Sequence, residues 1–194
     1  MGSWTLLEAV NHVLENGGEA PVSSLSTDSA SSSAIAARKI KAERLKVMSR
    51  GFEFNTTYPE MTPDINGNIG LGSEILSVDG WLSDANTKFT VKDGKLYDST
   101  NGTDEFTKNV KLRIISDMDF DDIRTQIQFQ IMASAAKSFQ RQYQQDQIMD
   151  VELVEEEAEA MNIAAEEEIR NNNFEPRDNT PIGRMLNRGI FRYD

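Results

Sequence analysis

The chain has 194 residues, no cysteine and one histidine, and its 20 Lys and Arg against 32 Asp and Glu give a net charge of -12. This length suffices for one well-buried core, and the lack of cysteine excludes disulfides and thiolate metal sites. The negative charge argues against general DNA binding, because phosphates attract cationic surfaces, and no apolar run approaches the roughly 20 residues that cross a bilayer.

Two helices are expected before residue 52. In the first, Leu6, Leu7, Val10, Val13 and Leu14 recur at helical spacing, and the helix ends at Gly17 and Gly18. The second follows a serine-rich loop, with Asp28 or a nearby serine as its cap. Its apolar side holds Ala36, Ala37, Ile40 and Val47, and Gly51 ends it.

Residues 52–115 follow a different pattern, in which short β-prone runs alternate with turn residues. Apolar and polar residues alternate at Phe52-Glu53-Phe54 and again over residues 110–115, and residues 75–78 precede an Asp-Gly turn. Residues 89–97 predict a β-hairpin, because Asp93-Gly94 tolerates the positive φ angles of a type I′ turn. A small antiparallel sheet with long loops is therefore expected.

A third helix is predicted to begin over residues 117–122, where four aspartates (Asp117, Asp119, Asp121 and Asp122) would lie near the positive end of the helix dipole. Ile123, Ile127, Ile131, Ala135 and Phe139 line one side of this helix, and Phe129, Met132 and Ala136 lie on others. A helix that is apolar on several sides should be central.

In the fourth helix, the apolar residues stand three or four apart: Ile148, Val151, Val154, Ala158, Met161, Ala165 and Ile169. Eight glutamates cover most of the remainder. Such a glutamate run is usually a solvated face. The sharper hypothesis is that Glu155, Glu156, Glu159 and Glu166 line a passage for DNA, where repulsion would keep the DNA from sticking.

The C-terminal segment differs in charge from the rest of the chain. From Arg170 onward it has five arginines and three acids, a net charge of +2, which leaves -14 for residues 1–169. Thr180-Pro181 is typical of a helix start, and an apolar and arginine-bearing short helix follows: Ile182, Arg184, Met185, Leu186, Arg188, Ile190 and Phe191. A helix this short is not stable alone in water, so residues 174–194 are expected to be an arm that docks on an acidic surface.

The fold class expected is therefore α+β: a bundle of about four helices with an inserted small antiparallel sheet and an extended C-terminal arm. The bundle takes residues 1–51 and 116–173, the inserted β region residues 52–115, and the docking arm residues 174–194.

No catalytic, metal or cofactor site is expected. His12 has no partners at metal-ligand spacing. Asp64, Asn66 and Asn68 imitate the start of a calcium loop, but Ile69 and Ile75 occupy the positions of its glycine and glutamate. The aspartates at 117–122 could hold Mg²⁺ as nucleases do, although helix capping explains them without a metal.

Several short strings together resemble the tail tubular protein A family of short-tailed phages. They are AVNHVL at residues 9–14, EAPVSSL at 19–25, SRGFEFN at 49–55, GKLYD at 94–98 and AAKSF at 135–139. The glutamate-rich helix that follows the last of them also fits, so the resemblance covers nearly the whole chain in order.

The resemblance implies a non-enzymatic head-to-tail adaptor that forms a dodecameric ring below the portal protein in the virion tail, after assembly in the host cytoplasm. The nozzle protein, tail tubular protein B, would attach on the other side, and tail fibres could contact the outside. The arm would dock on the portal or a neighbouring subunit, and the loop of Lys92, Asp93 and Gly94 would lie on the nozzle side.

The sequence leaves two other functions open beside the adaptor. One is a stand-alone intracellular binding module, which mass measurements with and without portal protein would distinguish. The other is a Mg²⁺-dependent nuclease acting through carboxylates, for which cleavage of plasmid DNA is the direct test.

Overall fold

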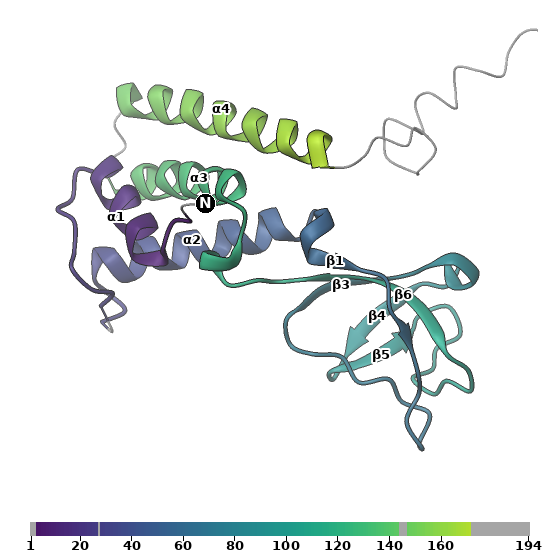
Figure 1. Ribbon diagram of the computed structural model, residues 1–194. Coiled ribbons are helices and arrows are strands. Elements are labelled where there is room, and N and C mark those ends of the chain that lie inside the picture. The colour runs from purple at the N-terminus through teal and green to yellow at the C-terminus, as the bar shows by residue number, and fades with distance from the viewer. Residues whose placement is uncertain (1–2, 27, 144–146, 172–194) are drawn as a thin grey trace, which may run out of the picture.

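The computed structural model describes residues 3–26, 28–143 and 147–171 (Figure 1). Within these residues, four α-helices form a bundle and a smaller region of strands lies beside it. The predicted α+β class is confirmed. The predicted docking arm, residues 174–194, lies outside the described residues.

The first two helices begin and end near the predicted signals. Helix α1 (Leu6–Asn16) starts with Thr5, whose hydroxyl accepts a hydrogen bond from the Glu8 amide while Glu8 accepts one from the Thr5 amide. Helix α2 (Ser32–Met48) is capped by Ser31, whose hydroxyl accepts from the Ala34 amide. The serine-cap prediction is confirmed, and α2 ends shortly before Gly51.

Helix α3 (Thr125–Tyr143) is the central helix of the bundle, as predicted. All its residues from Gln130 to Ala136 are buried. It lies between α2 and α4, and α1 also packs on it (Figure 1). Gln128 is fully buried on this helix, and its Nε2 donates to the carbonyls of Trp4 (2.9 Å) and Phe120 (2.7 Å). The amide of Trp4 donates in turn to Gln128 Oε1, so one side chain ties the N-terminal segment to α3.

The predicted start of the third helix at residues 117–122 is wrong. A 3-10 turn occupies Phe120–Asp122, and α3 begins later, at Thr125. Two of the aspartates bind other elements instead. Asp121 accepts a hydrogen bond from the amide of Leu6 at the start of α1 (2.8 Å), and Asp117 pairs with Arg44 of α2 (2.7 Å). The acidic cluster therefore caps and ties neighbouring helices.

Helix α4 (Gln147–Asn171) lies along α3 on the side away from α2 (Figure 1). Its packed face consists of Leu153, Ala160 and Ala164, with Glu157 beside them. The apolar stripe that the sequence shows faces outward: the exposed fractions are 60% for Val151, 40% for Val154, 36% for Met161 and 61% for Ile169. The face that packs is thus not the one that carries the larger apolar side chains.

The β region is organised around β6 (Val110–Ser116). It pairs antiparallel with β3 (Ile75–Gly80) and with two short strands, β1 (Thr56–Thr57) and β2 (Glu60–Met61). Strands β4 (Phe89–Lys92) and β5 (Lys95–Asp98) form a separate hairpin. Asp93 and Gly94 have φ angles of 53° and 72°, which confirms the turn predicted from the Asp-Gly pair.

The alternating Phe52-Glu53-Phe54 run is not a strand. Residues Glu53–Asn55 form a 3-10 turn, because the Asn55 side chain binds backbone groups that a strand would pair with a neighbour. Its Oδ1 accepts from the Phe52 amide at 2.7 Å, and its Nδ2 donates to the carbonyls of Met48 and Ser116, each at 2.9 Å. One buried side chain therefore joins the end of α2 to the end of β6.

The two parts of the fold have separate clusters of buried apolar side chains. The bundle cluster centres on α3, whereas the smaller β cluster contains Ile69, Val78, Leu96, Val110, Leu112 and Ile114. Among the described residues, no helix is long and apolar enough to cross a membrane.

Candidate functional site

The four glutamates predicted to line a passage for DNA lie on α4, where they differ in exposure. Glu155, Glu159 and Glu166 are exposed there. Glu156 differs, because it is half-buried and its Oε1 lies 3.3 Å from Nε2 of His12 on α1. Three of the four predicted glutamates therefore share a solvent-facing row, and the fourth contacts the bundle.

Glu157 was not singled out from the sequence, yet it fixes how α4 sits on α3. Its carboxylate accepts hydrogen bonds from Ser134 Oγ at 2.8 Å and from Lys137 Nζ at 2.5 Å. Burial alone would raise the pKa of the Glu157 carboxyl, but the two hydrogen bonds and the charge of Lys137 lower it below its ordinary value. Lys137 is the first charged residue within α3, and this was the signal that could have identified the pair.

Because Glu157 points inward, the rotation of α4 about its own axis is set. Leu153, Ala160 and Ala164 stand at helical spacing from Glu157 on the same side, so they face α3. The residues half a turn away, including Val151 and Ile169, must then face solvent. The ion pair and the small alanines explain why the larger apolar stripe is left outside.

The predicted nozzle-side loop lies in a different part of the molecule. Lys92, Asp93 and Gly94 are exposed in the turn between β4 and β5, and Lys92 Nζ lies 5.1 Å from the centre of the Tyr97 ring. Figure 1 places this hairpin in the β region, apart from α4, so the loop and the glutamate row do not form a single site. The predicted arm residues, Ile182 to Phe191, lie outside the described residues.

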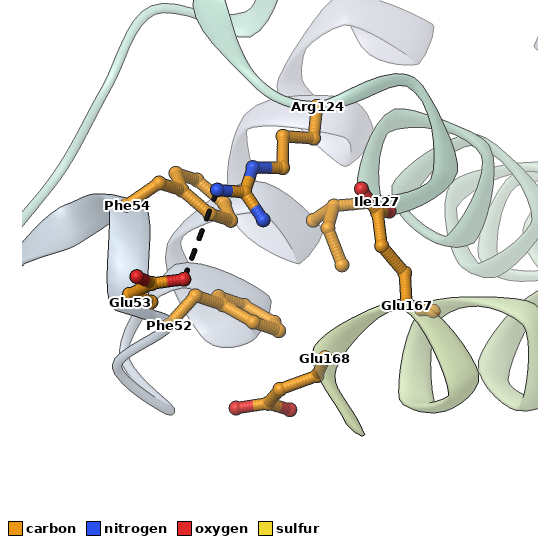
Figure 2. A pocket seen from close by; sticks show the side chains of 8 residues that line it. Phe52, Glu53, Phe54, Arg124, Ile127, Glu167 and Glu168 are labelled. Carbon is orange, nitrogen blue, oxygen red and sulfur yellow. Dashed lines mark ion pairs between the residues drawn. The ribbon is translucent and has the colours of Figure 1, made fainter. Parts of the chain in front are cut away.

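A pocket lies where the bundle meets the β region (Figure 2). Its walls come from the turn after α2, the start of α3 and the end of α4, and they consist of Phe52, Glu53, Phe54, Arg124, Ile127, Ala164, Glu167 and Glu168. The guanidinium of Arg124 lies 5.0 Å from the centre of the Phe54 ring, and its Nη2 lies 4.0 Å from Glu53 Oε2.

The side chains of this pocket pack the turn after α2 against α3 and α4. Phe52 and Phe54 stack with ring centres 5.4 Å apart, and Arg124 covers Phe54 from the α3 side. Burial raises the pKa of the Glu168 carboxyl, although Arg50 partly opposes the shift. The described acids and His12 contain no group of three that could hold a metal ion. Phe52, Ile127 and Ala164 belong to the bundle cluster, so we interpret the pocket as part of the packing of the bundle.

The loop that imitates a calcium site is closed by its own backbone. Asp64 Oδ1 accepts hydrogen bonds from the amides of Asn66 and Asn68, each at 2.8 Å. These bonds, with that of Asn68 the strongest, lower the pKa of the Asp64 carboxyl. This arrangement is a side-chain-stabilised turn of the kind that aspartate favours.

Two comparisons with known proteins identify a family for this chain. A family model described as tail tubular protein matches residues 7–174. A curated relative, "Tail tubular protein A" of Klebsiella phage KP34, is 34% identical over 117 residues, which cover 60% of this chain and 61% of the relative. The match thus spans less than two thirds of the relative's own length. On the extent of the family match, the chain belongs to the tail tubular protein family.

Proposed function

We propose that the chain is a structural subunit of a short phage tail, a ring-forming adaptor that connects the portal protein to the tail nozzle and surrounds the path of the DNA. The family match over residues 7–174 is the observation that carries this proposal. Its localisation is then the virion tail, after assembly in the host cytoplasm. The ring is dodecameric, as the family resemblance implies.

A non-enzymatic role fits the way the ionisable side chains are used. Asp117 and Asp121, which a Mg²⁺-dependent nuclease would need free, bind Arg44 and the Leu6 amide. Glu157 binds Ser134 and Lys137. These groups stabilise contacts between helices, so the protein acts through its surfaces.

The proposed partners follow from those surfaces. The C-terminal arm docks on the portal or on a neighbouring copy, the loop of Lys92, Asp93 and Gly94 faces the nozzle protein, and a tail fibre contacts the outside of the ring. With a net charge of -12, the subunit surrounds DNA without binding it, because its field repels phosphates at physiological salt.

The test is assembly on the portal. The full-length chain should run as a monomer or loose oligomer alone, since its charge opposes self-association, and should bind a purified portal ring in many copies. Light scattering measures both states, and a reconstruction of the particle at the portal vertex locates the chain. A chain that stays monomeric in intact particles would refute the ring, and submicromolar, salt-sensitive duplex binding would refute passive passage of DNA.

A further inference from the structure

Helix α4 presents a second apolar face that nothing in the described chain covers. Val151, Val154, Ala158, Met161, Ala165 and Ile169 are all exposed, and they stand three or four residues apart. This spacing is that of the seam through which one helix packs against another. The seam is flanked by the exposed Glu155, Glu159 and Glu166. Helix α4 packs on α3 through Leu153, Ala160 and Ala164, so most of its larger apolar residues are available to another surface.

Helix α2 has an outward face of the opposite charge. Its exposed and half-buried residues recur at helical spacing away from α3: Arg38, Lys41, Ala42 and Leu45. Ala42 is exposed and Leu45 half-buried, so a narrow apolar strip runs between the cations. Arg38 donates to the Ser29 carbonyl and remains exposed.

The charges of the two helices are complementary. Between Ser32 and Met48, α2 has five cations and one acid, a net charge of +4 in a chain of net charge -12. Between Gln147 and Asn171, α4 has nine acids and one arginine, a net charge of -8. Figure 1 shows the two helices on opposite sides of α3, so their outward faces point away from each other. One molecule cannot bring these faces together, but two molecules can.

We propose that the outward face of α4 in one copy packs against the outward face of α2 in the next copy, head to tail around the ring. The inference rests on the proposed ring and names the surfaces that form it. Contact between two different faces of one subunit generates a closed ring whenever its rotation closes. The lengths also match: at about 1.5 Å per residue, the seam from Val151 to Ile169 spans about 27 Å, and α2 about 24 Å.

Two other uses of the α4 face are less favourable. Pairing α4 with α4 about a two-fold axis would bring two helices of charge -8 together. A channel lining, the sequence-level hypothesis for the glutamates, would leave Val151 and Ile169 in water inside the ring. Packing on α2 covers the apolar seam and neutralises the glutamates at once.

The first test is disulfide capture, which the chain allows cleanly because it has no cysteine. Ala158→Cys on α4 and Ala42→Cys on α2 lie at exposed positions on the two proposed faces. The full-length double variant, oxidised on purified portal rings, should give a ladder of covalent multimers. Each single variant alone should give no covalent dimer, and a mixture of the two singles should give a dimer of one copy of each.

Each alternative has its own signature in this test. Dimers from Ala158→Cys alone would overturn the proposal in favour of an α4–α4 contact. A disulfide between position 158 and a cysteine placed at Asn187 would overturn it in favour of a face covered by the arm. No disulfide from position 158 to either partner would overturn it in favour of a channel lining. If mass measurement shows that no ring forms on the portal, the proposed function is wrong. If a ring forms without the disulfide between positions 42 and 158, only the proposed interface is wrong.

The second test exchanges charges. Glu155→Lys with Glu159→Lys, or Arg38→Glu with Lys41→Glu, should each reduce the fraction of chain in portal-bound rings at least tenfold. A mixture of the two variants should restore assembly, because in an alternating ring each contact joins either two unaltered faces or two charge-reversed faces, and both pairs attract. Matched controls at exposed β-region positions are Asp104→Lys with Glu105→Lys and Lys88→Glu with Lys108→Glu, which should assemble normally. Failure of the mixture to recover would overturn the pairing.

Discussion

The helical bundle and the β region are stabilised in different ways. Among the described residues, the bundle cluster contains nineteen buried apolar residues and the β cluster six. The β region instead has turns closed by carboxylates, such as Asp64, which accepts two backbone amides, and Asp98, which accepts two amides and the Asn101 side chain. The bundle should therefore be sensitive to lost volume, and the β region to lost hydrogen bonds.

The largest expected effect is in the centre of the bundle. Phe139 is fully buried, and a Cβ at Gly17 would lie 2.5 Å from its ring, so α1 approaches the ring through its backbone. Gly17 has no side chain that could fill the cavity left by Phe139→Ala, so the free energy of unfolding should fall by about 3–5 kcal/mol. Urea unfolding followed by circular dichroism measures this. Phe106→Ala removes a half-buried ring from the β region and should lower the free energy of unfolding clearly less. An equal loss would contradict the proposed difference between the two regions.

A smaller and more local effect is expected in the β cluster. Leu112 is fully buried there, so Leu112→Ala should destabilise the β region by about 2–4 kcal/mol. The two tryptophans allow the regions to be followed separately, because Trp4 lies in the bundle and Trp81 packs on Tyr58 in the β region with ring centres 4.6 Å apart. In a Trp4→Phe background, the fluorescence of Trp81 should change at lower urea than the helical signal. Coincident transitions would show that the two parts unfold as one.

A third substitution tests a hydrogen-bond network in the bundle. Gln128→Leu keeps the apolar bulk but removes the partners of three backbone groups of Trp4 and Phe120. Leaving buried backbone groups unpaired should cost about 1–3 kcal/mol. Gln126→Leu, at a half-buried position of the same helix, is the matched control and should be nearly neutral. If the two variants unfold at the same urea concentration, the network contributes nothing to stability.

The smallest effect concerns a β-region turn and depends on pH. Burial acts to raise the pKa of the Asp98 carboxyl, but hydrogen bonds from Asn101 and Thr100 outweigh it, and the pKa is lowered from 3.8. A lowered pKa means that the carboxylate contributes stability above its unfolded-state pKa, and that this contribution is lost as pH falls through the folded-state value.

Asp98→Asn should therefore lower the free energy of unfolding by about 1 kcal/mol at pH 7, and this loss should become smaller below about pH 4. Thermal unfolding from pH 7 to pH 2 measures the difference from the unsubstituted chain. Asp104→Asn, at an exposed position without a hydrogen bond of this kind, serves as the control. A difference that stays constant over the whole range would exclude the carboxylate as its cause.

Much of the fold could be predicted from local sequence signals. Ser31 as a cap, Asp93-Gly94 as a hairpin turn and the apolar sides of α3 each depend on residues close in the chain. The errors arose where a side chain binds a distant backbone group. Asp121 caps a helix more than a hundred residues away, and Asn55 turns a strand-like run into a 3-10 turn.

The surfaces were harder to predict for a related reason. Glu155, Glu156, Glu159 and Glu166 were predicted as one acidic surface, but Glu156 contacts His12 of the bundle. The apolar spacing in α4 did not identify its packed face. That face is set by the pair of Glu157 with Lys137, and a pairing between helices has no periodicity that can be read within one of them. An apolar stripe therefore predicts that a helix has a partner, and not that the partner belongs to the same chain.

The contacts of Asn55 determine which part of the chain can change without disturbing the bundle. The chain leaves the bundle after Met48 and returns to it after Ser116, and the Asn55 side chain binds the carbonyls of both residues. Thr56 pairs with Ile115 directly beyond this point, so the outgoing and returning strands lie next to each other. The two ends of the β region are therefore held at a fixed separation beside the bundle, whatever residues lie between them. Insertions or replacements within the β region, beyond Thr56 and before Ile115, should therefore leave the helices as they are.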